Sequence, residues 1–302
     1  MVLFVALAIA LFTFLVSATI ILFVVGPTLL LQPRRRSAEF YRKLGLPTNP
    51  SEVDLLYEEI VVSTTDNTKL DGWLIKAAAP VKGTIIYLHG VADCKIDGIR
   101  FAKLMHDNHF NIFLYDSRRH GNSDGKYCTY GFYEKHDVSR VIDYLAARND
   151  IELGKVGLFG PSMGAAVAIQ AAAIDKRIIA VVSESSFATL RTIFDDYQKR
   201  MIKLPFHYLR NLVIVHAELR VKFKASEVSP LEAVQTIRIP ILIVYGTDDH
   251  LIKHQYSLML FEKANQPKEI FPIHGAAHNN MWDIAGKEYG QKLLEFFGKY
   301  LT

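Results

Sequence analysis

From about residue 56 onward, the chain alternates between short apolar runs and amphipathic stretches. Continuous apolar runs are typical of strands that are buried on both faces of a sheet. Such runs cover residues 84–88, 111–115, 155–159, 178–183, 240–245 and 269–273. Helical patterns lie near residues 98–106, 134–148, 254–264 and 283–300, and an alanine-rich one begins after residue 164. This alternation predicts an α/β fold with a mainly parallel sheet and helices on both faces.

Two more predicted strands precede this alternating region. Apolar and polar positions alternate over residues 56–64 and 69–77, and Asp66-Asn67 forms a turn between them. The pattern predicts an antiparallel hairpin, which brings the predicted sheet to eight strands.

One long segment, at about residues 187–234, interrupts the alternation. It is too long for a connecting loop and repeats apolar residues at helical spacing among many lysines and arginines. We interpret it as an inserted helical cap. Its apolar face would cover a substrate pocket, lie on a membrane surface, or do both.

The amino-terminal segment has a different pattern, because residues 2–31 contain no charged side chain. About 20 helical residues cross a hydrocarbon core, so the segment is long enough to span a membrane. A cleaved signal peptide is the alternative, but the basic start and shorter apolar run of such peptides are missing. We therefore predict a transmembrane anchor at 1–32, a basic connector at 33–55 and a globular domain at 56–302.

Basic residues directly after the apolar segment predict its orientation. Arg34, Arg35 and Arg36 are followed by Arg42 and Lys43, whereas the amino-terminal side carries only the α-amine. Positive charge is typical of the cytoplasmic end of a membrane helix. A single-pass protein with its large domain on the cytoplasmic side is therefore predicted.

Charge and cysteine content exclude some classes of function. The 302 residues carry a net charge of +4, and no basic run with interleaved aromatic residues suggests a nucleic-acid partner. Cys94 and Cys128 are too few for a disulfide framework and fit a reducing compartment, although they could form one bridge.

The strongest candidate for chemistry is a Gly-x-Ser-x-Gly pattern at residues 160–164. An apolar strand precedes it and a helix follows it, so the chain must turn sharply and present the Ser162 hydroxyl at the carboxyl end of the sheet. Gly160 and Gly164 leave room for close strand–helix packing. The N–H of Met163 lies at the helix start, where an oxyanion would be stabilised. Ser162 is the candidate nucleophile.

Two later strand ends supply a candidate acid and a candidate base. Asp249 follows a buried strand and is favoured over Asp248, which lies nearer the strand exit. Glu184, at the end of another strand, is the alternative acid. His278 lies in a loop of small residues after the last strand and is favoured over His274 as the base. Serine, aspartate and histidine thus follow successive strands in one of the known orders of a catalytic triad.

The sequence His89-Gly90-Val91, at another strand end, completes the candidate site. Gly90 lets the backbone pass close to a substrate, and the Val91 N–H could pair with that of Met163 as an oxyanion hole. An ordinary turn is the alternative interpretation of this motif by itself. Cys94, just beyond, is expected to be an inert small residue rather than a reactive thiol.

Together these motifs resemble the α/β-hydrolase family over roughly residues 56–302. The matching stretches are Leu88-His-Gly90, residues 115–125, Gly160-Pro-Ser-Met-Gly164, Gly246-Thr-Asp-Asp249 and His278. With the apolar amino terminus, Gly72-Trp73 and Thr129-Tyr-Gly131, the chain is similar to the membrane-anchored Bem46/ABHD13-like branch. It departs from many relatives where Val91-Ala-Asp-Cys follows the His-Gly pair.

The resemblance implies acyl-enzyme chemistry with Ser162 as nucleophile, His278 as base and Asp249 as the residue that orients it, without a metal or an organic cofactor. It also implies that the loop with Arg118, Arg119 and His120 is structural. We expect a membrane-anchored serine hydrolase that cleaves ester or thioester bonds of small-molecule or lipid substrates with apolar acyl groups. The alternatives are an amidase or peptidase with the same triad, and a non-catalytic hydrolase-like binding module.

Overall fold

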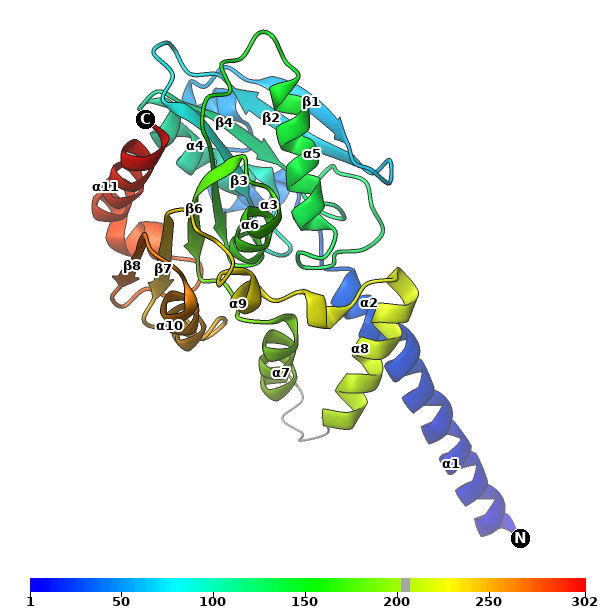
Figure 1. The fold of residues 1–302 in the computed structure, drawn as a ribbon. Helices are drawn as coiled ribbons and strands as arrows, with labels where there is room; N and C mark the ends of the chain where they lie inside the picture. The colour runs from blue at the N-terminus through cyan, green and yellow to red at the C-terminus, as the bar shows by residue number, and fades with distance from the viewer. Residues whose placement is uncertain (202–206) are drawn as a thin grey trace.

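The computed structural model describes residues 1–201 and 207–302 (Figure 1). An eight-stranded sheet lies at its centre, with the strand order β1-β2-β4-β3-β5-β6-β7-β8. β2 runs antiparallel to β1 and β4, and all other neighbouring pairs are parallel. The strands are β1 (Glu58–Ser63), β2 (Lys69–Ile75), β3 (Gly83–Leu88), β4 (Phe110–Tyr115), β5 (Val156–Pro161), β6 (Ile178–Glu184), β7 (Ile241–Gly246) and β8 (Lys268–Ile273). The predicted mainly parallel eight-stranded sheet with its amino-terminal hairpin is confirmed.

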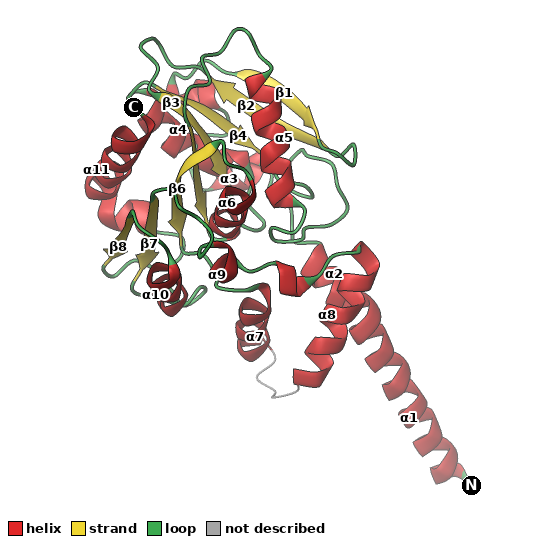
Figure 2. Cartoon of the chain, viewed as in Figure 1, coloured by secondary structure: helices red, strands yellow, loops and turns green. Residues whose placement is uncertain are grey.

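Two apolar cores lie on the two faces of the sheet. Along β3, Ile85 and Tyr87 join one core, and Ile86 and Leu88 join the other, because successive side chains of a strand point to opposite faces. α4 and α11 pack over the first core, and α5, α6 and α10 pack over the second (Figure 2). The bounds of these helices are α4 (Ile99–His106), α5 (Glu134–Ala146), α6 (Met163–Ile174), α10 (His254–Lys263) and α11 (Met281–Leu301). Shorter helical segments are α3 (Ala38–Lys43), η2 (Pro50–Val53), η3 (Lys95–Gly98) and η4 (Ala225–Glu227).

A continuous apolar helix at the amino terminus projects from the globular part (Figure 1). It consists of α1 (Val2–Ile20), a π-helical turn η1 (Ile21–Val25) and α2 (Gly26–Leu31). α1 has no buried residue, and at about 1.5 Å per residue its 19 residues extend over about 28 Å. The helix Val2–Leu31 is therefore long and apolar enough to cross a membrane.

The end of this helix is anchored in the globular part. Leu31 is only 1% exposed and belongs to the core of α5 and α6. Its carbonyl oxygen accepts a hydrogen bond of 2.8 Å from the Cys128 N–H, and the Tyr130 hydroxyl donates to Leu30 O at 2.7 Å. α2 is therefore packed as part of the fold.

The segment predicted as a cap lies between β6 and β7 and contains α7 (Leu190–Met201), α8 (His207–Val221) and α9 (Pro230–Ala233). The part of that prediction that falls on residues 202–206 lies outside the described residues. α8 packs beside η1 and α2: the Phe23 and His216 rings meet edge to face at 5.2 Å, and Arg220 Nη1 donates to Thr28 Oγ1 at 3.1 Å. One helix of the segment therefore contacts the apolar helix.

The loop after β4 braces the sheet, as the sequence predicts. Arg118 donates two hydrogen bonds, of 2.7 and 2.6 Å, to the two carboxylate oxygens of Asp137 on α5, and a third of 3.0 Å to Asp66 in the β1–β2 turn. His120 is buried, and its Nδ1 lies 3.0 Å from Arg118 O. These contacts tie β4 to the hairpin and to α5.

Candidate active site

Ser162 lies at the sharp turn between β5 and α6. Its φ of 55° and ψ of −116° lie outside the regions that L-residues normally adopt. Its N–H donates to Glu184 O at 2.7 Å, which fixes the turn against β6. A Cβ added to Gly164 would lie 1.8 Å from Leu88 O, so α6 can approach β3 this closely only with glycine there. The structure has the strand–turn–helix geometry that the motif predicts.

His278 and Asp249 are in direct contact, with 2.7 Å between Nδ1 and Oδ2. Asp249 Oδ1 accepts hydrogen bonds from the N–H groups of Leu251 (2.9 Å) and Ile252 (2.8 Å). Burial by itself would raise the pKa of Asp249, but the hydrogen bond and charge of His278 and the two backbone N–H groups lower it below its usual value. An ionised carboxylate only accepts hydrogen bonds, so His278 Nδ1 carries the proton and Nε2 is left as the basic nitrogen.

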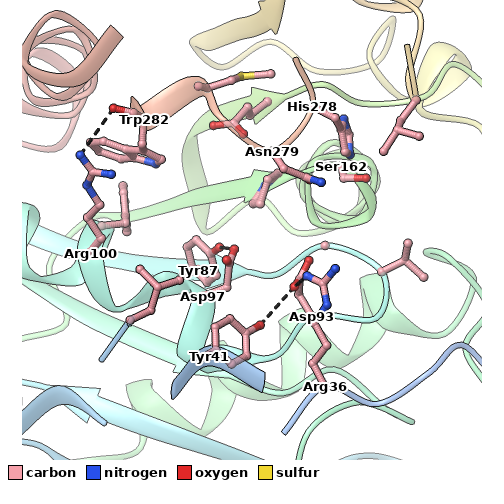
Figure 3. Close-up of a pocket in the computed structure, with 18 of the residues that line it drawn as sticks. Arg36, Tyr41, Tyr87, Asp93, Asp97, Arg100, Ser162, His278, Asn279 and Trp282 are labelled. Carbon is pink, nitrogen blue, oxygen red and sulfur yellow. Dashed lines mark hydrogen bonds and ion pairs between the residues drawn. The ribbon is translucent and has the colours of Figure 1, made fainter. Parts of the chain in front are cut away.

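Ser162 and His278 line the same cavity, and Figure 3 shows the imidazole beside the serine side chain. The structure therefore brings together the predicted nucleophile, base and acid from the ends of β5, β8 and β7. Ser162 is 9% exposed, and the His278 side chain is 12% exposed. Both groups are thus largely shielded from solvent.

The alternative residues have other surroundings. Asp248 donates its backbone N–H to Ala276 O at 3.0 Å and belongs to the turn after β7. Glu184 accepts a hydrogen bond from the Tyr289 hydroxyl, and His274 is exposed. Asp249 is thus the carboxylate that contacts the candidate base.

The loop after β3 lies next to the elbow. A Cβ built on Gly90 would lie 3.6 Å from Ser162 Cβ, and Val91 lines the cavity. His89 Nε2 accepts a hydrogen bond from Ser117 N–H at 2.9 Å, so its Nδ1–H donates to Gly90 O at 2.7 Å. Burial lowers the pKa of His89 to about 4, so the ring is neutral and fits this pattern. His89 therefore fixes the start of the loop, a role that the sequence did not indicate.

The cavity has a volume of about 430 Å³ and reaches from Ser162 to the segment that follows the apolar helix. Its wall is mainly apolar and aromatic, and residues 40–46 contribute Phe40, Leu44 and Leu46 to it. Tyr197 of α7 also lines it. Residues 33–55, predicted as a connector, thus contribute to this cavity, which their sequence did not indicate.

The carboxyl groups of Asp93, Asp97 and Glu184 are among the polar groups that line the cavity. Burial raises the pKa of Asp93 and of Glu184 to about 7, and the nearby charge of Asp97 adds to the effect at Asp93. Tyr87 donates its hydroxyl to Asp97 Oδ2 at 2.6 Å. Arg36 and Arg100 line the same cavity, so its wall carries groups of both signs.

Replacing Glu184 by glutamine should stabilise the protein at pH 8 but not at pH 5. The folded-state pKa of about 7 lies above that of a glutamate in an unfolded chain, so stability falls as the pH rises from the unfolded value through the folded one. Glutamine is neutral, and its side-chain oxygen can still accept a hydrogen bond from the Tyr289 hydroxyl. We expect a gain of about 2 to 3 kcal/mol at pH 8, measured from thermal unfolding. Exposed Glu288→Gln serves as control, and equal shifts at both pH values would contradict the interpretation.

Both cysteines are free and buried, so the structure has no disulfide between them. Burial raises the pKa of the Cys94 thiol to about 12, which agrees with the prediction of an inert residue. In the part of the chain that the structure describes, no group of three or more His, Cys, Asp or Glu side chains could hold a metal ion.

The sheet, the strained serine after β5 and the histidine after β8 define the α/β-hydrolase class of proteins. Residues 79–235, just over half of the chain, match the sequence family described as serine aminopeptidase, S33. The chain therefore belongs to this family within the α/β-hydrolase superfamily.

Two relatives extend the match in sequence. YqkD of Bacillus subtilis is 30% identical over 215 residues, which cover 70% of each chain. The α/β hydrolase domain-containing protein WAV2 of Arabidopsis thaliana is 24% identical over 267 residues, which cover 84% of this chain and 82% of the relative. The similarity thus extends well beyond the elbow motif.

Two solved structures share the fold. The esterase Pf2001 of Pyrococcus furiosus superposes with a TM-score of 0.73 at 25% identity, covering 90% of this chain and 99% of the esterase. The acylaminoacyl peptidase of Pyrococcus horikoshii superposes with a TM-score of 0.62 at 18% identity, covering 82% of this chain and 42% of the peptidase. At that identity the peptidase shows a shared fold alone.

Proposed function

We propose that the protein is a serine hydrolase that cleaves ester or thioester bonds through an acyl-enzyme intermediate. The observation that carries the proposal is the contact of Asp249 with His278, which lines one cavity together with the strained Ser162. Removing a serine proton requires a base whose tautomer is fixed, and an ionised aspartate on Nδ1 supplies that. The family match and the esterase neighbour support the same chemistry.

In the proposed mechanism, Ser162 Oγ attacks the carbonyl carbon of the substrate while His278 Nε2 takes the hydroxyl proton. The carbonyl oxygen becomes an oxyanion, which the N–H groups of Val91 and Met163 stabilise. His278 then returns the proton to the leaving group as the bond to that group breaks. In the second half of the reaction, His278 takes a proton from water, which attacks the carbonyl carbon of the acyl-enzyme. His278 then returns the proton to Ser162 Oγ as the bond between the serine and the acyl group breaks.

The apolar part of the cavity wall supports a substrate with an apolar acyl group. Phe40, Leu44 and Leu46 offer apolar surface to such a group. Small-molecule sites commonly have this size and apolar character. An amidase or peptidase activity is the second candidate, favoured by the description of the matching family as serine aminopeptidase.

We also propose that residues 1–32 anchor the protein in a membrane as a single span, as in the Bem46/ABHD13-like branch. Residues 33–55 would be the connector, and residues 56–302 the hydrolase domain on the cytoplasmic side. Burial of Leu31 and the hydrogen bonds to Leu30 and Leu31 support an uncleaved segment, since cleavage behind the apolar run would open the core. The exposed apolar side chains of α8 next to α2, Leu212, Val215 and Leu219, are suited to the membrane surface.

One experiment tests both proposals. Membranes that contain the full chain are treated with a fluorophosphonate probe, which labels activated serines, and are then washed with alkaline carbonate. We expect a labelled band of full-chain mass that stays in the membrane pellet, and p-nitrophenyl ester hydrolysis that exceeds peptide amide hydrolysis. A labelled band in the wash would contradict anchoring. A folded protein that does not label would favour the non-catalytic binding module, and faster amide cleavage would favour the peptidase.

A further inference from the structure

The loop from Gly90 to Asp93 carries one of the two proposed oxyanion donors, the Val91 N–H. Side chains from another segment of the chain contact this loop. Ala92 has a φ of +66°, a region that L-residues rarely adopt, and Asp93 N–H donates to Gly90 O at 3.2 Å to close the turn. A Cβ on Gly90 would lie 3.2 Å from Asp93 Oδ2 and 3.6 Å from Ser162 Cβ. The Asp93 carboxyl group and the Ser162 side chain therefore both lie close to the position where Gly90 lacks a side chain.

The segment that follows the apolar helix forms hydrogen bonds with two adjacent residues of this loop, Ala92 and Asp93. Arg36 N–H donates to Ala92 O at 3.2 Å, and its guanidinium forms an ion pair and hydrogen bond with Asp93. Tyr41, which is 2% exposed, donates its hydroxyl to Asp93 Oδ1 at 3.1 Å. Figure 3 shows Arg36 and Tyr41 converging on Asp93 at the end of the cavity that faces away from Trp282.

The ring of Phe40 holds the arginine in turn, with Arg36 Cζ 4.4 Å from the ring centre. The Arg36 side chain is 34% exposed and that of Asp93 17%, so the pair is partly shielded from water. The Asp93 carboxyl group faces Arg36, Tyr41 and the carboxyl group of Asp97. Arg36 is its cationic neighbour and opposes the protonation that burial and Asp97 favour.

We propose that Arg36 is a positioning residue of the active site, which holds the 90–93 loop so that the Val91 N–H points at the oxyanion. This inference rests on the proposed acyl-transfer function. Arg36 acts through Asp93 and the Ala92 carbonyl rather than by contact with the reacting atoms. Arg36 would then have a role in positioning the active site in addition to its place in the connector after the apolar helix.

The test compares Arg36→Ala and Arg36→Lys with Arg34→Ala in the full chain in detergent. Arg34 is the matched control, because it is an exposed arginine two residues away. We expect Arg36→Ala to lower kcat for p-nitrophenyl butyrate roughly 10- to 100-fold, since a displaced oxyanion donor weakens transition-state binding. KM should stay within about threefold, since substrate binding is not affected. Arg36→Lys should recover part of kcat, and Arg34→Ala should match the parent.

Hydrogen–deuterium exchange of the peptide that covers residues 89–94 gives a second readout that needs no activity. We expect faster exchange there in Arg36→Ala than in Arg34→Ala, with unchanged exchange in β5 and β6. A raised KM with unchanged kcat would overturn the proposal and point to substrate contact by Arg36. Unchanged exchange together with unchanged kcat would also overturn it. If the parent chain neither labels nor hydrolyses esters, the proposed function fails, and exchange alone decides whether Arg36 holds the loop.

Discussion

Replacing Ser162 by alanine should abolish fluorophosphonate labelling and lower kcat for p-nitrophenyl ester hydrolysis by about 10⁶-fold. Without the hydroxyl there is no nucleophile for the His278 base to activate, and no acyl-enzyme can form. Alanine fits the space, so thermal unfolding should stay close to that of the parent chain. The measurement is the initial rate of ester hydrolysis by purified full-chain protein, with the active-site concentration obtained from probe labelling of the parent.

Asp249→Asn should lower kcat about 10⁴-fold while the fold is retained. The amide can donate to His278 Nδ1, and this selects the tautomer whose Nε2 carries a proton and cannot act as the base. The N–H groups of Leu251 and Ile252 still have an oxygen to bond, so the side chain stays in place. Ser257→Ala is the matched control, since its hydroxyl is buried without a hydrogen-bond partner among the described residues. Full activity in either triad variant would exclude the proposed mechanism.

The sheet and the elbow were predictable because their signals are local. Each buried strand is a continuous apolar run, and the glycines around Ser162 mark where the strand must turn into the helix. Parallel strands also end at one edge of a sheet, so residues after strand ends are brought together whatever their separation in sequence. That rule predicts Asp249 and His278 near Ser162, and the order of serine, aspartate and histidine along the chain favours them over the other residues at strand ends.

The connector's part in the cavity was not predictable, because it depends on single side chains that meet across long distances in sequence. Arg36 and Asp93 are 57 residues apart, and Tyr289 and Glu184 are 105 residues apart. The hydrophobic pattern of the sequence does not indicate which polar side chains form such pairs, and a charged residue in a loop is usually solvated. From the sequence, Arg36 therefore indicates only the orientation of the predicted membrane helix.

The same limit applies to the inserted helices. Apolar residues at helical spacing predict that a helix buries one face, but the pattern does not identify what covers it. In the structure, α8 packs against the apolar amino-terminal helix, with the Phe23 and His216 rings in contact, whereas α7 contributes Tyr197 to the cavity. α7 thus agrees with the prediction of a pocket cover, whereas the contact of α8 with the apolar helix does not test the alternative of a membrane surface.

The buried ion pair of Lys95 and Asp116, which follows the 90–93 loop in the chain, should contribute strongly to the free energy of unfolding. Lys95 Nζ lies 2.7 Å from Asp116 Oδ2 at the end of β4 and 2.5 Å from Asp71 Oδ1 on β2. The Lys95 side chain is 3% exposed and that of Asp116 is 1% exposed. Asp116 also accepts hydrogen bonds from the N–H groups of Lys95 (2.7 Å) and Asn122 (2.8 Å). This carboxylate therefore connects three segments of the chain and has one buried cation beside it.

Lys95→Met should lower the free energy of unfolding by about 3 to 5 kcal/mol, because it leaves the buried carboxylate of Asp116 without its cation. For a domain of this size, we expect the midpoint of thermal unfolding to fall by about 10 °C. The double variant Lys95→Met/Asp116→Asn should recover much of the loss, since the uncompensated charge and not the missing attraction is the main cost. Lys43→Met, which removes an exposed pair with Glu39, should change stability by less than about 0.5 kcal/mol. If the double variant is as unstable as the single one, the loss of stability would come from the missing contact of the Lys95 side chain with the Trp73 ring and not from the unpaired charge of Asp116.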